Sequence, residues 1–386
     1  MSASRRLRTC AAALAGVLLM AGGGATPARA GSAEPVASTL APTMPCEDLL
    51  FVGVRESGGT PPFGAVVGPI RDAVQQRWPG TMRQVYLDYP AANPHELTQA
   101  ELEGLLLDVT PPSPAYLDSV AQGVAGLRAV VDDSSARCPR EQVIVVGFSQ
   151  GAQVITEMLS TGSRVPRLRG ALQLGNPLHY PGQNVRELDG QVDTPAMGLD
   201  AMLTYLRTTA APSPDRTREQ SVLDLIRALV RLYEGSVPNA EIAGAIRSGR
   251  ATLPASEYQR VFSVCLSGDL VCDAAAGLWR VLSRESTLSQ EYDRARPRHL
   301  GYTLPAVDAS VAAILANGPL PSPPASEPAP TGGGPATRPV AWPPPFDSPV
   351  GTLLGLAGVA LLAVAVAGGL ALAYRAGVRR GRRAPP

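Results

Sequence analysis

A serine flanked by two glycines carries the strongest chemical signal in this sequence. Gly147, Ser149 and Gly151 form a Gly-x-Ser-x-Gly motif, preceded by the apolar residues 142–146 and followed by a helical pattern over 153–159. A sharp turn between a buried strand and a helix exposes the serine hydroxyl at the edge of a sheet, as a nucleophile elbow requires. Glycines on both sides let the two backbones approach closely. The motif predicts Ser149 as a nucleophile; a glycine-rich turn without chemistry is the competing interpretation.

A serine hydroxyl attacks poorly near neutral pH, so Ser149 needs an adjacent base. The sequence contains 3 histidines. His299 lies in a loop before the last expected helix and comes last in the order serine, acid, histidine that accompanies this motif. We therefore expect His299 to be the base. His179, in a turn after an Asn-Pro pair, is the alternative base or lines the pocket.

The base needs a carboxylate that fixes its orientation and stabilises the imidazolium. Asp269 lies between Ser149 and His299 in the chain, just after an expected strand, and we expect it to be this acid. Asp273 is the competitor. A solvated aspartate in a tight turn is the interpretation of Asp269 without a catalytic role.

An oxyanion formed in such a site needs hydrogen-bond donors. The backbone N–H of Gln150, directly after the serine, is one donor expected from the motif. The loop 55–59, which follows the first expected strand, should supply the second. Ser57 in this loop offers both an N–H and a hydroxyl, so we expect Ser57 and Gln150 to form the oxyanion hole.

The elements around these residues alternate between strands and helices. Apolar runs predict strands at 49–54, 84–89, 143–146, 169–174 and 258–266, and helical patterns occupy 69–78, 115–131 and 305–315. This alternation predicts an α/β fold with right-handed crossovers and a mostly parallel, doubly wound sheet. Catalytic groups then belong at the carboxyl ends of the strands.

The alternation is interrupted by an insertion over about 180–255. An amphipathic helix is expected at 218–233 and a shorter one at 239–247, and no strand is evident. The insertion is a lid or acyl-chain groove over the active-site edge, or a packed helical hairpin without a role in substrate binding.

The two ends of the chain predict export and anchoring. Residues 1–30 have the basic start, short apolar core and small-residue cleavage site of a signal peptide. After the folded domain 31–318, a Pro/Ala-rich linker covers 319–347. An uncharged apolar stretch then predicts a membrane helix at 350–374, followed by the basic cytoplasmic tail 375–386. The catalytic domain should therefore lie outside the cytoplasmic membrane.

The balance of charges excludes one class of partner. The formal net charge is +1. Without the four arginines of 1–30 and the five of 375–386, 25 arginines face 33 acidic residues, a net charge of −8. Phosphate binding needs a positive surface, so nucleic acid is not expected as a partner.

Four cysteines remain once the signal peptide is removed. In an oxidising compartment an even number predicts disulfides, and four cysteines allow three pairings. Cys265 and Cys272 are near enough in sequence to close a small loop around Asp269, which leaves Cys46 with Cys138. A zinc site lacks a Cys-x-x-Cys motif, and neither a metal nor another cofactor is expected.

Several segments together resemble the cutinase family over about 46–318. They are Cys46, Val54-Arg55-Glu56-Ser57-Gly58, Gly147-Phe148-Ser149-Gln150-Gly151-Ala152, the segment from Cys265 to Cys272 with Gly268-Asp269-Leu270-Val271-Cys272, and His299-Leu300-Gly301-Tyr302. The resemblance implies an α/β-hydrolase with a five-stranded parallel sheet and an ester-hydrolysing activity. It implies Ser149 as nucleophile, Asp269 as acid and His299 as base. It also implies the oxyanion hole Ser57 and Gln150 and the disulfides Cys46–Cys138 and Cys265–Cys272.

Three departures from the family shape the expected substrate. Glu56 stands where the family usually has glycine, and the stretches from Ser149 to Asp269 and from Asp269 to His299 are long. The helical insertion is reminiscent of phage lysin-B mycolyl esterases. A lipid or cell-envelope ester is therefore the expected substrate. Acyl transfer or mycolyl-type hydrolysis on envelope glycolipids is the enzymatic alternative, and an inactive envelope-binding protein is the non-enzymatic one.

Overall fold

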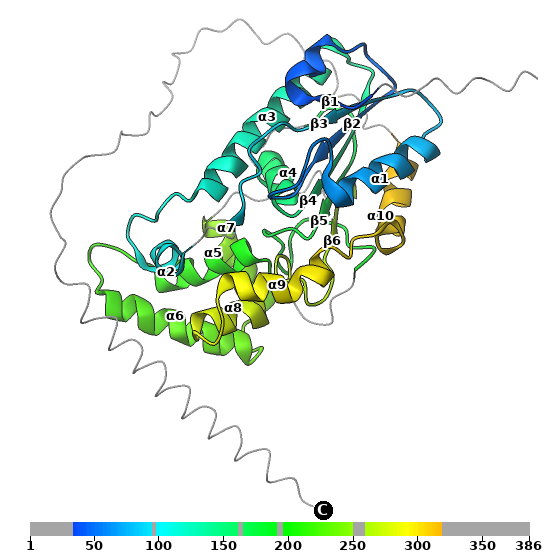
Figure 1. The fold of residues 1–386 in the computed structure, drawn as a ribbon. Coiled ribbons are helices and arrows are strands. Elements are labelled where there is room, and N and C mark those ends of the chain that lie inside the picture. The colour runs from blue at the N-terminus through cyan, green and yellow to red at the C-terminus, as the bar shows by residue number, and fades with distance from the viewer. Residues whose placement is uncertain (1–33, 95–97, 161–164, 191–195, 250–258, 319–386) are drawn as a thin grey trace, which may run out of the picture. The chain divides into compact units, whose positions relative to one another are not determined.

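The computed structural model describes residues 34–94, 98–160, 165–190, 196–249 and 259–318 (Figure 1). These residues all fall in one compact unit. The predicted signal peptide 1–30, linker 319–347, membrane helix 350–374 and tail 375–386 lie outside the described residues. Within the described part, no single helix is long and apolar enough to cross a membrane, although one pair of helices bent by 68°, 288–299 with 304–316, meets the criteria of length and composition.

Within the described residues the sheet has six parallel strands in the order β1-β3-β2-β4-β5-β6. The strands are β1 (Val36–Ala37), β2 (Leu49–Val54), β3 (Met82–Tyr86), β4 (Gln142–Phe148), β5 (Leu168–Leu174) and β6 (Val261–Val264). The expectation of five strands was wrong, because β1 adds a sixth at the edge by pairing Val36 with Val85. A strand of two residues is too short to show an alternating pattern. The α/β fold with a parallel sheet is confirmed.

Helices cover both faces of this sheet (Figure 1). The helices α1 (Gly64–Arg77) and α10 (Leu304–Ala316) pack on one face, and α3 (Ala115–Arg137) and α4 (Gln150–Ser160) pack on the other. Successive strand residues point to opposite faces. In β2, Leu50 belongs to the core shared with α3 and α4, whereas Leu49 belongs to the core shared with α1 and α10.

The region of the predicted helical insertion builds its own core at the carboxyl end of the sheet (Figure 1). It contains α5 (Leu199–Ala210), α6 (Arg218–Tyr233) and α7 (Asn239–Gly249), and it packs on α2 (Gln99–Leu107) and α8 (Ala275–Leu282). The predicted helix 218–233 agrees with α6, which begins at a capping box made by Thr217 and Gln220. Helices α2, α5 and α8, and the helix α9 (Leu288–His299), were not predicted.

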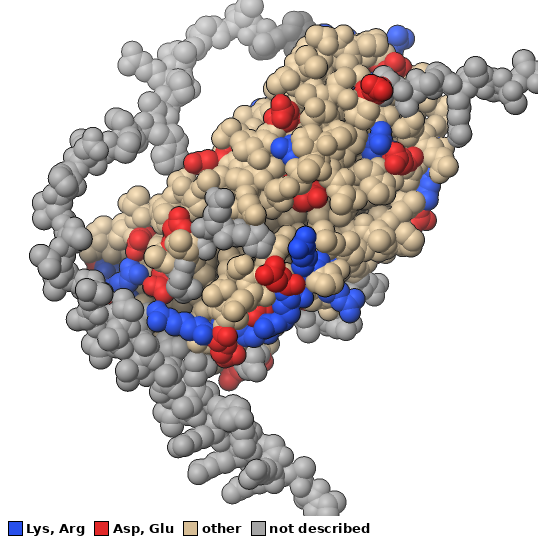
Figure 2. All heavy atoms as spheres, viewed as in Figure 1, with Lys and Arg blue, Asp and Glu red and all other residues tan. Residues whose placement is uncertain are grey.

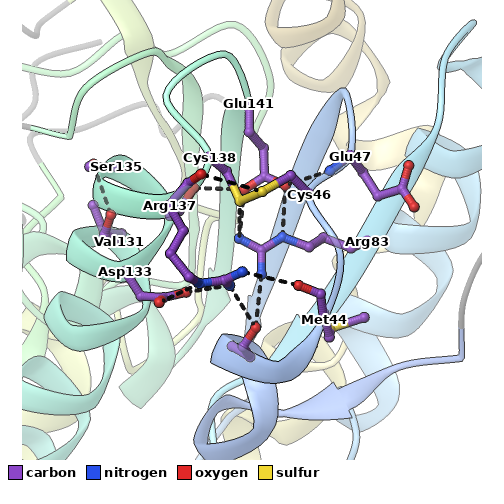
Figure 3. A network of polar contacts seen from close by, with 12 residues as sticks. Met44, Cys46, Glu47, Arg83, Val131, Asp133, Ser135, Arg137, Cys138 and Glu141 are labelled. Atoms are coloured by element: carbon purple, nitrogen blue, oxygen red, sulfur yellow. Dashed lines mark hydrogen bonds and ion pairs between the residues drawn. A yellow bond between two sulfur atoms is a disulfide. The ribbon is translucent and has the colours of Figure 1, made fainter.

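A polar cluster closes the opposite end of the sheet (Figure 3). Arg83 of β3 and Glu141, directly before β4, form an ion pair of 2.6 Å with both side chains completely buried. Glu141 also accepts from the Ser134 hydroxyl at 2.7 Å. The disulfide Cys46–Cys138 lies beside this pair, with an S–S distance of 2.00 Å. The cluster thus joins the chain before β2 to β3 and β4, on the side of the sheet away from Ser149.

Charged side chains of both signs are interspersed on the face drawn in Figure 2. Over the insertion, the arginines have acidic neighbours, as in the pairs Arg231–Glu241 and Arg218–Asp108. This face therefore lacks the continuous basic field that nucleic acid requires.

Candidate active site

Ser149 occupies a sharp turn between β4 and α4. Its φ angle is +56°, in the left-handed region, and its N–H donates to the Leu174 carbonyl at 2.9 Å. A Cβ at Gly151 would lie 2.1 Å from the Val54 carbonyl oxygen, and one at Gly147 would lie 2.5 Å from the Gly151 backbone. Only glycine fits at both positions, which explains the motif: the helix and two strands meet at van der Waals distance around the serine.

Asp269 and His299 form a buried hydrogen-bonded pair at the same edge of the sheet. His299 Nδ1 lies 2.8 Å from Asp269 Oδ1 and 3.0 Å from Oδ2. The carboxylate also accepts the Val271 N–H at 2.9 Å and the Tyr302 hydroxyl at 2.6 Å. Three donors on one carboxylate fix its orientation and so fix the imidazole ring.

The other ring nitrogen of His299 is left open. His299 Nε2 is buried and has no hydrogen-bond partner among the described residues. With Nδ1 donating to Asp269, Nε2 carries the lone pair that accepts a proton. The centroid of the His299 ring lies 4.6 Å from the ring centroid of Phe148, the residue before Ser149, and 5.8 Å from that of Tyr292. His299 thus packs on the end of β4, next to the residue that precedes Ser149.

A cavity of about 540 Å³ has Ser149 in its lining. Its other walls come from α5, from the proline-rich segment before α3, and from Leu270, Val271 and Tyr292 next to the aspartate and histidine. This volume lies within the usual ~300–1,000 Å³ of ligand pockets. A substrate in this cavity would contact the serine directly.

Similarity to known proteins shows the family of this chain. A family model described as Cutinase matches residues 45–284, which is more than half of the 386 residues. The chain belongs to the cutinase family. The match begins just before Cys46 and ends after α8, so it includes Ser149 and Asp269.

Individual relatives of this cutinase-family chain are distant. Acetylxylan esterase 2 of Talaromyces purpureogenus is 25% identical over 153 residues, which are 36% of this chain and 59% of that protein. Cutinase 11 of Verticillium dahliae is 24% identical over 153 residues, or 36% of this chain and 47% of that protein. The chain therefore spans about half the length of these curated relatives. Among solved structures, the catalytic core domain of acetyl xylan esterase from Trichoderma reesei is 18% identical, with 71% of this chain and 100% of that chain covered and a TM-score of 0.41.

The two alternative candidates lie elsewhere in this cutinase-family site. His179 is buried, its Nδ1 lies 3.4 Å from the Ser263 hydroxyl, and its Nε2 lies 3.4 Å from a Glu187 oxygen. Burial lowers the pKa of His179 to about 4, so its ring is neutral at pH 7. Asp273 accepts the Gly268 N–H at 2.9 Å instead of facing His299.

The expected oxyanion donors belong to the start of α4 and to the loop after β2. Gln150 is the first residue of α4, where backbone N–H groups have no partner within the helix. Its side chain is completely buried and donates to the carbonyls of Ala92 and Tyr116 at 3.3 Å. Ser57 is half-buried in the loop after β2, and the Gly58 N–H binds the Ala91 carbonyl at 2.7 Å. Both residues remain predictions as oxyanion donors.

The carboxylate of the unusual Glu56 lies beside Gly59 of this loop and Gly64 of α1. One of its carboxylate oxygens accepts the Ala65 N–H at 3.4 Å, at the start of α1. Arg55 instead holds the loop: its guanidinium donates to the carbonyls of Leu87 at 2.8 Å and of Tyr89. Sequence reasoning missed Arg55, because a buried arginine that binds backbone carbonyls leaves no pattern in the sequence.

The disulfide Cys265–Cys272 is present, with an S–S distance of 2.03 Å, and it encloses Asp269 as expected. Cys272 Sγ lies 3.6 Å from Asp269 Oδ2. The bridge therefore constrains the loop that carries the acid. Among the described residues, no group of three or more His, Cys, Asp or Glu side chains could hold a metal ion.

His299 was expected in a loop, and this expectation was wrong: it is the last residue of α9. The helix begins at a capping box made by Thr287 and Gln290. Glu291 in its first turn is almost fully buried and pairs with Arg280 of α8 at 2.5 Å. This pair fixes α9 on α8 and so fixes the helix end that presents the imidazole.

We expect acid to loosen this helix pair. Hydrogen bonds from Arg280, and then from Ser286 and Arg294, lower the pKa of Glu291 to about 2. Because the pKa in the folded state is below its unfolded value, the carboxylate stabilises the fold above about pH 4.3, and this contribution is lost as the pH falls toward about 2. Glu291→Gln should lower the urea midpoint of unfolding near neutral pH. At about pH 3 the midpoints of the variant and the parent protein should differ by less than they do near neutral pH. An equal loss at both pH values would contradict this assignment.

Tyr302 is a further positioning residue that sequence reasoning did not single out for a role. Burial raises the pKa of Tyr302 well above its ordinary value, so its hydroxyl stays protonated and donates to Asp269. Tyr302→Phe removes this bond and should lower kcat/KM about tenfold, as expected for a hydrogen bond to a charged group.

The pH profile distinguishes positioning from general damage in Tyr302→Phe. Without the phenol, the carboxylate interacts more strongly with the imidazolium formed during catalysis, so the acid limb of kcat/KM should move to higher pH. A fall in kcat/KM with an unchanged pH profile and a lower melting temperature would indicate a structural role only.

Proposed function

We propose that this cutinase-family protein is a serine carboxylic ester hydrolase that uses Ser149, His299 and Asp269 as a catalytic triad. The observation that supports the proposal is the buried Asp269–His299 pair. The ring centroid of His299 lies 4.6 Å from that of Phe148, the residue before Ser149, and Nε2 has no hydrogen-bond partner among the described residues. The two curated relatives named above are an acetylxylan esterase and a cutinase, which supports ester chemistry for this chain.

The proposed reaction has two halves. Ser149 Oγ attacks the ester carbonyl while its proton passes to His299 Nε2, and the Asp269 carboxylate stabilises the resulting imidazolium. The N–H of Gln150 and the donors of Ser57 stabilise the oxyanion. When the C–O bond breaks, the imidazolium returns the proton to the leaving alcohol. Water then attacks the acyl-serine through the same base, releasing the carboxylic acid and restoring the serine.

The proposed location is outside the cytoplasmic membrane. Two disulfides fit an oxidising compartment. We propose that residues 1–30 direct export and that 350–374 anchor the domain by a single membrane helix, both outside the described residues. An anchored enzyme meets esters of its own membrane or cell envelope, so a lipid or cell-envelope ester is the proposed substrate.

A fluorophosphonate probe tests this function, because it reacts with an activated serine and mimics the tetrahedral intermediate. The full-length protein should be labelled, and Ser149→Ala should abolish labelling. Ser236→Ala, a serine whose hydroxyl binds the Arg231 carbonyl far from the elbow, is the matched control and should be labelled fully. Folded protein that is not labelled would contradict the proposal.

A further inference from the structure

The cavity beside Ser149 follows one complete face of α5. The α5 residues in its lining recur at helical spacing and include Leu199, Asp200, Leu203, Thr204, Arg207 and Thr208. Side chains at such spacing lie on one face of a helix. Since α5 spans Leu199–Ala210, with a rise of 1.5 Å per residue the cavity extends roughly 18 Å from its serine end. The cavity is therefore an elongated channel.

The polar atoms on this face already have protein partners. Arg207 donates to the carbonyls of Leu105 at 2.7 Å and Asp108 at 2.9 Å. Asp200 accepts from the side-chain amide of Gln153 at 2.8 Å. The Thr208 hydroxyl lies within hydrogen-bond distance of a carbonyl of α7. These residues therefore present mainly methylene and methyl groups to the channel.

The opposite wall is aliphatic. It is built by leucines and prolines before and within the start of α3, among them Leu105, Pro111, Pro112, Pro114 and Leu117. A bound group with many hydroxyls would lose its water without finding free partners along this wall, which costs free energy. A hydrocarbon chain loses nothing by the transfer and gains about 0.8 kcal/mol for each methylene buried.

Helix α5 is a fixed wall of the channel. At its start, the Gly198 N–H binds the His179 carbonyl at 2.8 Å and the Leu199 N–H binds the Val271 carbonyl at 2.9 Å. Its other face carries Tyr205 and Leu206, which are buried in the core of the insertion. A helix held by both its end and its buried face does not need to open for a substrate to enter along its exposed face.

We infer that the channel along α5 binds the long hydrocarbon chain of the ester, with the ester group at Ser149. The inference rests on the proposed ester hydrolysis and names its substrate class. It also assigns the insertion, whose role the sequence left open between a lid, a groove and an inert hairpin. Leu203 and Thr208 then set how much of the chain the channel accepts.

Chain-length profiles of the full-length protein test this inference. With p-nitrophenyl esters from acetyl to palmitoyl, kcat/KM should rise by up to about fourfold per methylene until the channel is full. A second series, acetates of increasingly long alcohols, shows whether the acyl or the alkyl chain occupies the channel. A preference for acetyl esters of short alcohols would overturn the inference.

Substitutions within the channel locate the chain. Leu203→Trp should remove the preference for long chains, so that kcat/KM no longer rises with chain length. Thr208 lies five residues beyond Leu203 along the helix, a distance of about 7.5 Å. Thr208→Trp should therefore shorten the preferred chain by fewer carbons than Leu203→Trp does. Leu223→Trp, on the exposed surface of α6, is the matched control and should keep the parent profile.

The failure of this inference differs from failure of the proposed function. If fluorophosphonate labelling and acetyl ester turnover persist in all variants while Leu203→Trp keeps the long-chain preference, the channel assignment is wrong and ester hydrolysis stands. If the parent protein is not labelled, ester hydrolysis itself is wrong. Labelling of Leu203→Trp also shows that this variant is folded.

Discussion

Ser149→Ala should lower kcat for a p-nitrophenyl ester about a millionfold, the loss typical of removing a nucleophilic serine from a triad. The substitution deletes the oxygen that attacks the ester, and it keeps a Cβ at a position where φ is +56°. Because alanine and serine meet similar strain there, the melting temperature should stay close to that of the parent protein. Initial rates and a thermal unfolding curve of the same preparation check both expectations.

The companion variants identify the acid. Asp269→Asn should lower kcat about ten-thousandfold, because an amide at this position favours the wrong imidazole tautomer. Asp273→Asn is the matched control, four residues away, and should stay within about tenfold because Asp273 binds only loop backbone. Full activity of Ser149→Ala, or a larger loss in Asp273→Asn than in Asp269→Asn, would overturn the proposed triad.

Glu141→Gln should lower the free energy of unfolding by about 3–5 kcal/mol, the largest stability effect expected in this domain. The substitution leaves the guanidinium of Arg83 buried without its countercharge. It also weakens the acceptor for the Ser134 hydroxyl and for the Glu47 N–H. Urea unfolding followed by linear extrapolation measures the effect.

Two further variants separate ion pairing from packing in this cluster. Asp108→Asn breaks an exposed pair with Arg218 and should change stability little, since solvent screens such pairs. The double variant Arg83→Met with Glu141→Leu replaces the buried pair by apolar groups and should recover much of the loss. A loss in the double variant as large as in Glu141→Gln would show that the charge itself is not the cause.

The catalytic neighbourhood was predictable because its constraints are local. Only glycine fits beside Ser149, so the elbow appears in the sequence as a spaced motif. Asp269 is one of the six residues between Cys265 and Cys272, and His299 is the histidine that follows it. Strands buried on both faces, such as Leu49–Val54, also appear as continuous apolar runs.

The remaining features depend on contacts between distant segments. Helix α9 has few apolar residues, and it is held by a capping box and by the pair Arg280–Glu291. The edge strand β1 consists of two residues that need β3 as a partner. Arg83 and Glu141 lie 58 residues apart, and no sequence pattern near either residue predicts their ion pair. The channel along α5 forms only when helices far apart in the chain meet.

Two hydrogen bonds in series join the channel to the proposed catalytic acid. The Leu199 N–H at the start of α5 binds the carbonyl of Val271, whose own N–H binds Asp269. Val271 also lines the channel, so a chain that fills the channel would contact the segment that orients the carboxylate. Contacts made by the chain far from the ester can then stabilise the transition state. A longer chain should therefore raise kcat as well as lower KM. The insertion would then make the rate of the chemical step depend on the length of the bound chain.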